Sequence, residues 1–197
     1  MKKLLGIIVL SLITLSVPSY AFDIYKFKIE GMGIGDSLLD FYNEDEINNF
    51  LKMNYPSGDD EYSGYEIQQS MGKIKFNTYD SITLHIKTND KKKKIASISG
   101  IKLYPNKLEK CLKYRDKLAK EIKDSLNNPV EDEYTTTYGD DNISKGYTKE
   151  FKIEKGSIRF WCNDWDENWE AAKYWEDDFN FSIDSTELLY WVFNKAY

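Results

Sequence analysis

The chain has 197 residues, with 33 acidic and 27 basic side chains and a formal net charge of −6. This acidic balance argues against nucleic acid and anionic membrane surfaces as partners, because proteins that bind them present basic faces. One histidine and two cysteines leave few groups for a metal site or for nucleophilic catalysis.

The first 21 residues have the pattern of a secretory signal peptide. Lys2 and Lys3 precede an uncharged apolar run over residues 4–17, and Ser19 and Ala21 are small residues at positions −3 and −1 of a cleavage site. The run is shorter than the ~20 apolar residues of a transmembrane helix. We therefore expect an exported protein, periplasmic or secreted, with no membrane span in the mature chain.

Residues 22–197 are long enough for a single domain with its own core. In an exported chain, two cysteines most simply form one disulfide, which predicts a Cys111–Cys162 bridge. A metal site or a catalytic thiol would need more ligands or a nearby base, and His85 is the single histidine.

The first half predicts a strand, short helical turns and then an antiparallel meander. Asp36 or Ser37 can cap one turn, and Asn43 with Glu46 has the spacing of a capping box. Alternating polar and apolar residues predict four strands, at residues 26–30, 73–78, 81–87 and 95–104.

The second half predicts a long helix and another meander. Asn106 has capping spacing to Glu109, and an apolar stripe that includes Cys111 continues to Leu126. The polar stretch 131–146 suggests a long mobile loop or a loose hairpin. Further strands are expected at 148–154, 157–162 and 178–183, and Asp184 or Ser185 should cap a final helix.

This element order predicts an α+β fold: an antiparallel meander sheet with helices on one face. Because a helix precedes each meander, the order also suggests two similar helix-plus-meander halves.

Residues 35–38, Gly-Asp-Ser-Leu, resemble the signature of the GDSL esterases and lipases, which implies Ser37 as a nucleophile. That family takes its base from an Asp-x-x-His motif, which this sequence does not contain, and His85 lies within an expected strand. Because a serine nucleophile needs a base within hydrogen-bond reach, we interpret the tetrapeptide as a helix cap. A small secreted serine esterase using Ser37 is the alternative function.

The pattern Gly31-x-x-Ile34-Gly35-x-Ser37, opening a helix after a strand, resembles the start of the small outer-membrane-assembly lipoproteins. The expected two halves are also similar to those of the β-lactamase-inhibitor proteins. The resemblance implies protein binding through a sheet face, without catalysis. The cysteine of a lipoprotein is absent here.

Residues 160–179 contain four of the five tryptophans and seven interleaved acids. We expect Trp165 and Trp169, flanked by polar residues, to be exposed, and Trp161 and Trp175 to pack in the core. Exposed indoles beside carboxylates suit protein contacts and sugar stacking. Trp165, Trp169, Asp164 and Asp166 are therefore the predicted binding residues, in an uncharacterised binding protein for a protein or envelope-glycan partner.

Asp164-x-Asp166-x-Asn168 resembles the opening of an EF-hand loop. Trp169 replaces its turn glycine and Trp175 its bidentate glutamate, so we expect no metal site and no cofactor. A purely structural envelope protein, whose aromatic residues only pack, is a third interpretation.

Overall fold

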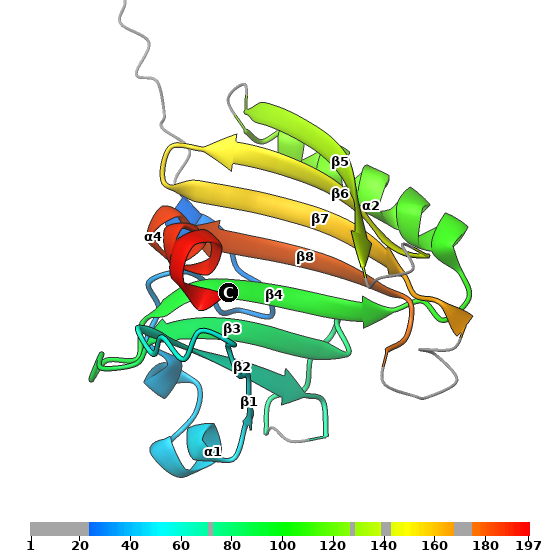
Figure 1. Ribbon diagram of the computed structural model, residues 1–197. Helices are drawn as coiled ribbons and strands as arrows, with labels where there is room; N and C mark the ends of the chain where they lie inside the picture. The colour runs from blue at the N-terminus through cyan, green and yellow to red at the C-terminus, as the bar shows by residue number, and fades with distance from the viewer. Residues whose placement is uncertain (1–23, 71–72, 127–128, 139–142, 168–174) are drawn as a thin grey trace, which may run out of the picture.

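The computed structural model describes residues 24–70, 73–126, 129–138, 143–167 and 175–197; the expected leader lies outside them. One eight-stranded antiparallel sheet, in the order β1-β2-β3-β4-β8-β7-β6-β5, forms the centre of the molecule (Figure 1). Its strands are β1 (Leu51–Lys52), β2 (Tyr62–Gln68), β3 (Ser81–Lys87), β4 (Ile95–Leu103), β5 (Val130–Tyr138), β6 (Ser144–Ile153), β7 (Gly156–Asp164) and β8 (Asp178–Ser185). The helical elements are η1 (Ile24–Lys26), η2 (Leu38–Asp40), α1 (Glu44–Asn48), α2 (Leu108–Lys123), α4 (Thr186–Trp191) and η3 (Val192–Ala196).

The fold is α+β, as the sequence predicts, and each half is a helical segment followed by a four-stranded meander. Elements η2 and α1 precede β1–β4, and α2 precedes β5–β8. The two meanders join through antiparallel pairing of their last strands, β4 and β8. None of the helices in the described ranges is long and apolar enough to cross a membrane.

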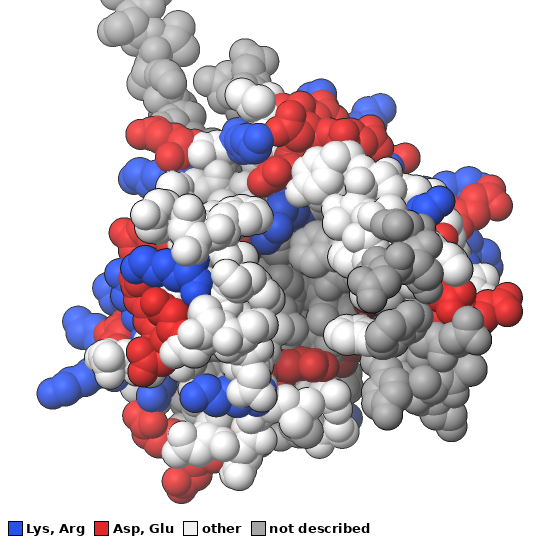
Figure 2. Space-filling model, viewed as in Figure 1, with Lys and Arg blue, Asp and Glu red and all other residues white. Residues whose placement is uncertain are grey.

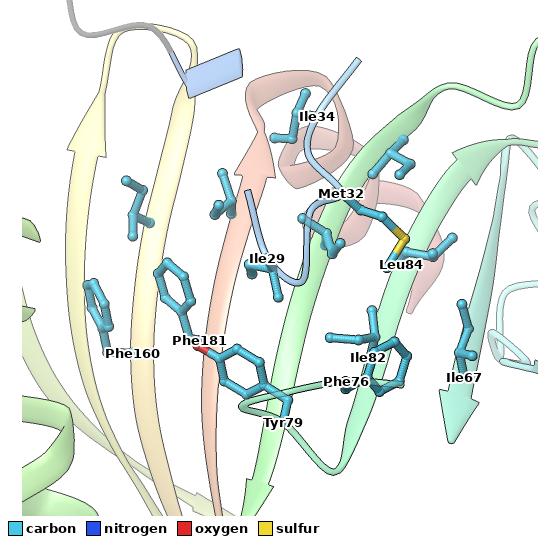
Figure 3. Packing of buried hydrophobic residues seen from close by; sticks show 14 of the residues in the cluster. Ile29, Met32, Ile34, Ile67, Phe76, Tyr79, Ile82, Leu84, Phe160 and Phe181 are labelled. Carbon is cyan, nitrogen blue, oxygen red and sulfur yellow. The ribbon is translucent and has the colours of Figure 1, made fainter. Parts of the chain in front are cut away.

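One face of the sheet carries the main hydrophobic core. Helix α2 packs against β6, β7 and β8 on this face, and the predicted disulfide joins Cys111 of α2 to Cys162 of β7, with a Cα–Cα distance of 6.0 Å. The N-terminal segment covers the other half of the same face, where Ile29 and Met32 lie over strands that carry Ile82 and Leu84 (Figure 3). This face therefore holds both halves of the molecule together.

The C-terminal helix lies on the opposite face, in front of the sheet in Figure 1, whereas α2 lies behind it. Trp191 of α4 packs on Tyr62 of β2 and Tyr55, with ring centroids 5.3 Å and 4.8 Å away. Its indole Nε1 donates to Asp59 Oδ1 at 2.8 Å. This second, smaller core ties the end of the chain to the first meander.

Two of the expected strands need correction. Residues 73–78 form a connection, because side chains bind its backbone: Gln69 exchanges hydrogen bonds with Phe76, and the Glu30 carboxylate accepts from the N–H groups of residues 77–79. Residues 26–30 form a turn with one isolated bridge, Ile29↔Met32. The polar stretch 131–146 follows the hairpin alternative, as part of β5–β6, whereas β2 is a strand that the sequence did not predict.

The caps largely follow prediction. Asn43 and Glu46 form both bonds of a capping box, Ser37 caps η2, and Ser185 caps α4. Asn106 does not cap α2: it adopts a positive φ of 54°, and Lys107 takes the N-cap position without a side-chain bond.

Candidate ligand-binding face of the sheet

The sheet face that points away from α2 is polar, and we call it the polar face. Since side chains alternate along a strand, the residues between the core positions of β7 and β8 must share this face, and the pairing extends it across β3 and β4. Its central members are Thr83, His85, Ser97, Ser99, Ser157, Arg159, Trp161, Asn163, Asp178, Asn180, Ser182 and Asp184. Figure 2 shows this side of the molecule hollowed between the C-terminal helix and the β5–β6 side, with basic and acidic groups reaching into the hollow.

An ion pair lies in the middle of this face. The Asp184 side chain is buried, and its Oδ2 accepts from Arg159 Nη2 at 2.9 Å and Nε at 3.1 Å. Two hydroxyl groups also donate to it, Ser97 Oγ at 2.6 Å and Ser182 Oγ at 2.7 Å. Burial opposes its ionisation, but the guanidinium and the hydroxyls hold the pKa of Asp184 below its usual range.

The Arg159 side chain is partly exposed to solvent. A quarter of its side chain is exposed, and its guanidinium lies 5.6 Å from the ring centroid of Trp161 on the same strand. The polar face thus presents a cation held in place by a buried carboxylate and an aromatic ring.

A second polar cluster lies where β7 ends and β8 begins. Asp178 Oδ1 accepts from Nδ2 of Asn163 at 2.8 Å and also from Nδ2 of Asn180, and Tyr138 donates its hydroxyl to Asn163 Oδ1 at 3.1 Å. Burial raises the pKa of Asp178 to about 7, although both amide groups favour the charged form. This carboxyl therefore titrates near neutral pH.

Three aromatic rings stack beside this cluster. Trp165 lies between Tyr138 and Trp175, with ring centroids 5.0 Å apart on each side and interplanar angles of 25° and 26°. The Trp165 indole N–H is close enough to lower the pKa of Asp178, but it is buried and makes no hydrogen bond of normal geometry with any described residue. Trp175, at the outer end of the stack, is 49% exposed. The stack offers a large, rigid apolar surface next to hydrogen-bonding groups.

A glycine makes room for the stack. A Cβ on Gly146 would lie 2.4 Å from the Tyr138 hydroxyl and 3.1 Å from its ring, so the ring can lie on this strand only because the side chain is absent. The backbone around the stack is held by side chains: Asp177 accepts from the Trp165 N–H at 2.8 Å, and Ser144 Oγ from the Asp166 N–H at 2.9 Å.

His85 lies on the same face, but its ring is hydrogen-bonded to Tyr55, a residue of the second core. Its Nε2 shares a short hydrogen bond with the Tyr55 hydroxyl, and its Nδ1 is buried without a partner in the described part of the chain. Burial lowers its pKa to about 4, so the ring is neutral at physiological pH.

The structure brings part of the predicted binding region onto the polar face. Trp165 forms the centre of the stack, whereas Asp164, the last residue of β7, follows the core-facing positions Phe160 and Cys162 in the alternation of the strand. Trp169 lies outside the described residues. The expected core position of Trp175 is wrong, because its ring caps the open end of the stack.

The segment that resembles an EF-hand loop, Asp164-x-Asp166-x-Asn168, lies in the same region. Asp166 is described, but Asn168 lies outside the described residues. In the described part of the chain, no three His, Cys, Asp or Glu side chains come together in a way that could hold a metal ion.

Sequence reasoning missed the Arg159–Asp184 and Asp178–Asn163 clusters. A local signal exists: Ser182 and Asp184 alternate with Phe181 and Ile183, which indicates a strand with one apolar and one polar side. The pairing of β8 with both β4 and β7 decides which other polar residues lie next to Ser182 and Asp184.

Ser37 has the contacts of a helix cap. Its Oγ accepts from the Leu39 N–H at 3.2 Å and donates to the Lys92 carbonyl at 2.6 Å. None of these contacts supplies the base that the esterase alternative requires, and His85 bonds Tyr55 instead.

Comparison with protein-family models, with curated proteins and with solved structures produces no match for this chain. The functional argument therefore depends on the geometry of the polar face.

Proposed function

We propose that this is an exported, non-catalytic binding protein that engages a macromolecular partner, a protein or an envelope glycan, on the polar face. The observation that carries the proposal is the aromatic stack of Tyr138, Trp165 and Trp175 beside a buried network of amide, hydroxyl and carboxyl groups.

Apolar packing in the place of these polar groups would stabilise a fold about as well. A buried ion pair such as Arg159–Asp184 contributes little net stability compared with apolar packing. Rigid indole rings and a partly exposed guanidinium, in contrast, are groups that dominate recognition surfaces. The composition of the hollow therefore favours a role in binding.

Export rests on two independent features. The first 21 residues have the three-part pattern of a signal peptide, and the Cys111–Cys162 disulfide is typical of proteins that fold in an oxidising compartment. Together they favour the periplasm or the extracellular medium.

Tryptophan fluorescence of the oxidised mature protein tests the proposal. Its emission should be quenched by acrylamide and should shift on addition of a purified envelope protein fraction or one member of a glycan panel. Emission that is blue, resistant to quenching and unchanged by every addition would support the structural interpretation instead.

A variant test assigns the site. Replacing Trp165→Ala together with Trp169→Ala should weaken binding of the identified partner at least tenfold, whereas the control Phe193→Ala, an exposed ring on η3, should leave it within twofold. Unchanged affinity in the double variant would show that the partner binds elsewhere.

A further inference from the structure

A second depression adjoins the polar face at the end of the aromatic stack, and we call it the acidic pocket. Its volume is about 530 Å³. It is lined by Glu66, Gln68, Gln69, Ser70, Asp80, Ser81, Leu103, Trp175 and Glu176.

The acidic pocket is continuous with the candidate binding face. Leu103 of β4 pairs with Asp178, the carboxyl at the centre of the second polar cluster. Trp175 belongs to both places: its ring stacks on Trp165 and also lines the pocket. A partner on the polar face would therefore reach the pocket without crossing another element.

All the charged side chains that line the acidic pocket in the described residues are acidic. None of Glu66, Asp80 and Glu176 forms an ion pair with any described residue. Two have one weak or backbone contact: Glu66 accepts from Gln68 Nε2 at 3.3 Å, and Asp80 from the Leu103 N–H at 2.8 Å. Three carboxylates thus share a cavity without a described counter-charge.

Another large pocket among the described residues has a different composition. It has a volume of about 580 Å³, lies beside α4 and combines lysines with acids, among which Lys87 and Glu187 pair at 3.2 Å. The acidic pocket therefore differs from this second pocket in that its charged side chains all have the same sign.

The pocket also contains apolar surface of the right kind. Leu103 is 44% exposed, and Trp175 presents an indole ring whose other side is stacked on Trp165. Long cationic side chains combine an apolar stem with a charged head, and an ammonium or guanidinium over an indole face gains a cation–π attraction.

We propose that the acidic pocket binds a lysine or arginine side chain of a protein partner, with the stem along Leu103 and Trp175 and the charged head among the three carboxylates. This inference rests on the proposed function and narrows it, because it selects a basic protein segment over a neutral glycan. A neutral sugar can donate its hydroxyl groups to these carboxylates but leaves their charge uncompensated, whereas a cation also supplies the missing counter-charge.

Titration of the oxidised mature protein with acetyl-Lys-Lys-Lys-amide tests the inference. Tryptophan fluorescence and calorimetry should show saturable binding that weakens at least fivefold between 50 and 300 mM salt, because exposed charges are screened. The same peptide with acetylated side chains, and acetyl-Glu-Glu-Glu-amide, should not bind.

The matched variants are Glu66→Gln/Glu176→Gln in the pocket and Glu109→Gln/Glu121→Gln on the exposed face of α2. Both remove two negative charges, so a general charge effect would weaken binding equally. We expect at least a tenfold loss in the pocket variant and less than twofold in the α2 variant, with Trp175→Ala also losing at least fivefold. Equal losses in the two double variants, or no loss in the pocket variant, would overturn the assignment.

Failure of this inference is distinguishable from failure of the proposed function. If the lysine peptide does not bind but a glycan or a non-basic protein still shifts the tryptophan emission, the acidic pocket is not a cation site and the polar face remains a binding surface. If no addition changes the emission, both proposals are wrong.

Discussion

Asp178→Asn should remove a pH-dependent penalty on folding. Burial raises the pKa of this carboxyl from 3.8 to about 7, so the folded protein holds the proton more tightly than the unfolded chain. Stability must then fall as the pH rises through the window between these values, from about 4 to about 7. At about 1.4 kcal/mol per pH unit, the full window corresponds to about 4 kcal/mol.

The Asn side chain has the same shape, can accept from both Asn163 and Asn180, and carries no charge at any pH. We therefore expect the difference in unfolding free energy, variant minus wild type, to increase by about 3 kcal/mol between pH 4.5 and pH 7.5. Urea unfolding followed by circular dichroism at several pH values measures it.

The pH dependence of the wild-type unfolding free energy must be subtracted, because a neighbouring carboxyl group also titrates. Burial raises the pKa of Asp177 as well, and this group stays in the variant. The other groups around Asp178, namely Tyr138, Trp165 and the two amide side chains, do not titrate in this window. A difference that does not change with pH, or a variant less stable than wild type at pH 7.5, would refute the burial of an ionisable Asp178.

Three further perturbations probe the rest of the structure. Reducing the disulfide, which spans 51 residues, should lower the unfolding free energy by about 4 kcal/mol; an unchanged urea midpoint would contradict this. Arg159→Met should cost about 3–5 kcal/mol because it leaves Asp184 buried without a counter-charge, and adding Asp184→Asn should restore part of the loss; no recovery would count against the pair. Gly146→Ala should displace the Tyr138 ring, whose hydroxyl lies 2.4 Å from the new Cβ position, and cost about 1–3 kcal/mol; a near-ultraviolet circular dichroism spectrum identical to wild type would show that the stack tolerates the methyl group.

Local rules accounted for much of the fold. Capping needs only neighbouring residues, and Asn43 with Glu46, Ser37 and Ser185 behave as their spacing predicts. The α+β class, helix α2 and the strands over residues 81–87 and 157–162 follow from apolar periodicity, which is also a local property. The disulfide was predictable because the sequence contains two cysteines and begins with the pattern of a signal peptide.

Local rules failed where distant side chains decide the backbone. Residues 73–78 alternate like a strand, but Glu30 and Gln69 bind their backbone groups and hold them as a connection. Strand β5, with its charged and threonine-rich sequence, has the composition of a loop and forms a strand because β6 pairs along its whole length.

The candidate site shows the same division. The sequence by itself pointed to the tryptophan-rich region and to Trp165, because aromatic and acidic residues concentrate there. Tertiary structure alone decided that Trp175 is the exposed ring, that Arg159 meets Asp184, and that three carboxylates from separate segments share one pocket. The physical reason is that strand pairing places side chains as far as 87 residues apart on one surface, and no local pattern specifies which strands will be neighbours.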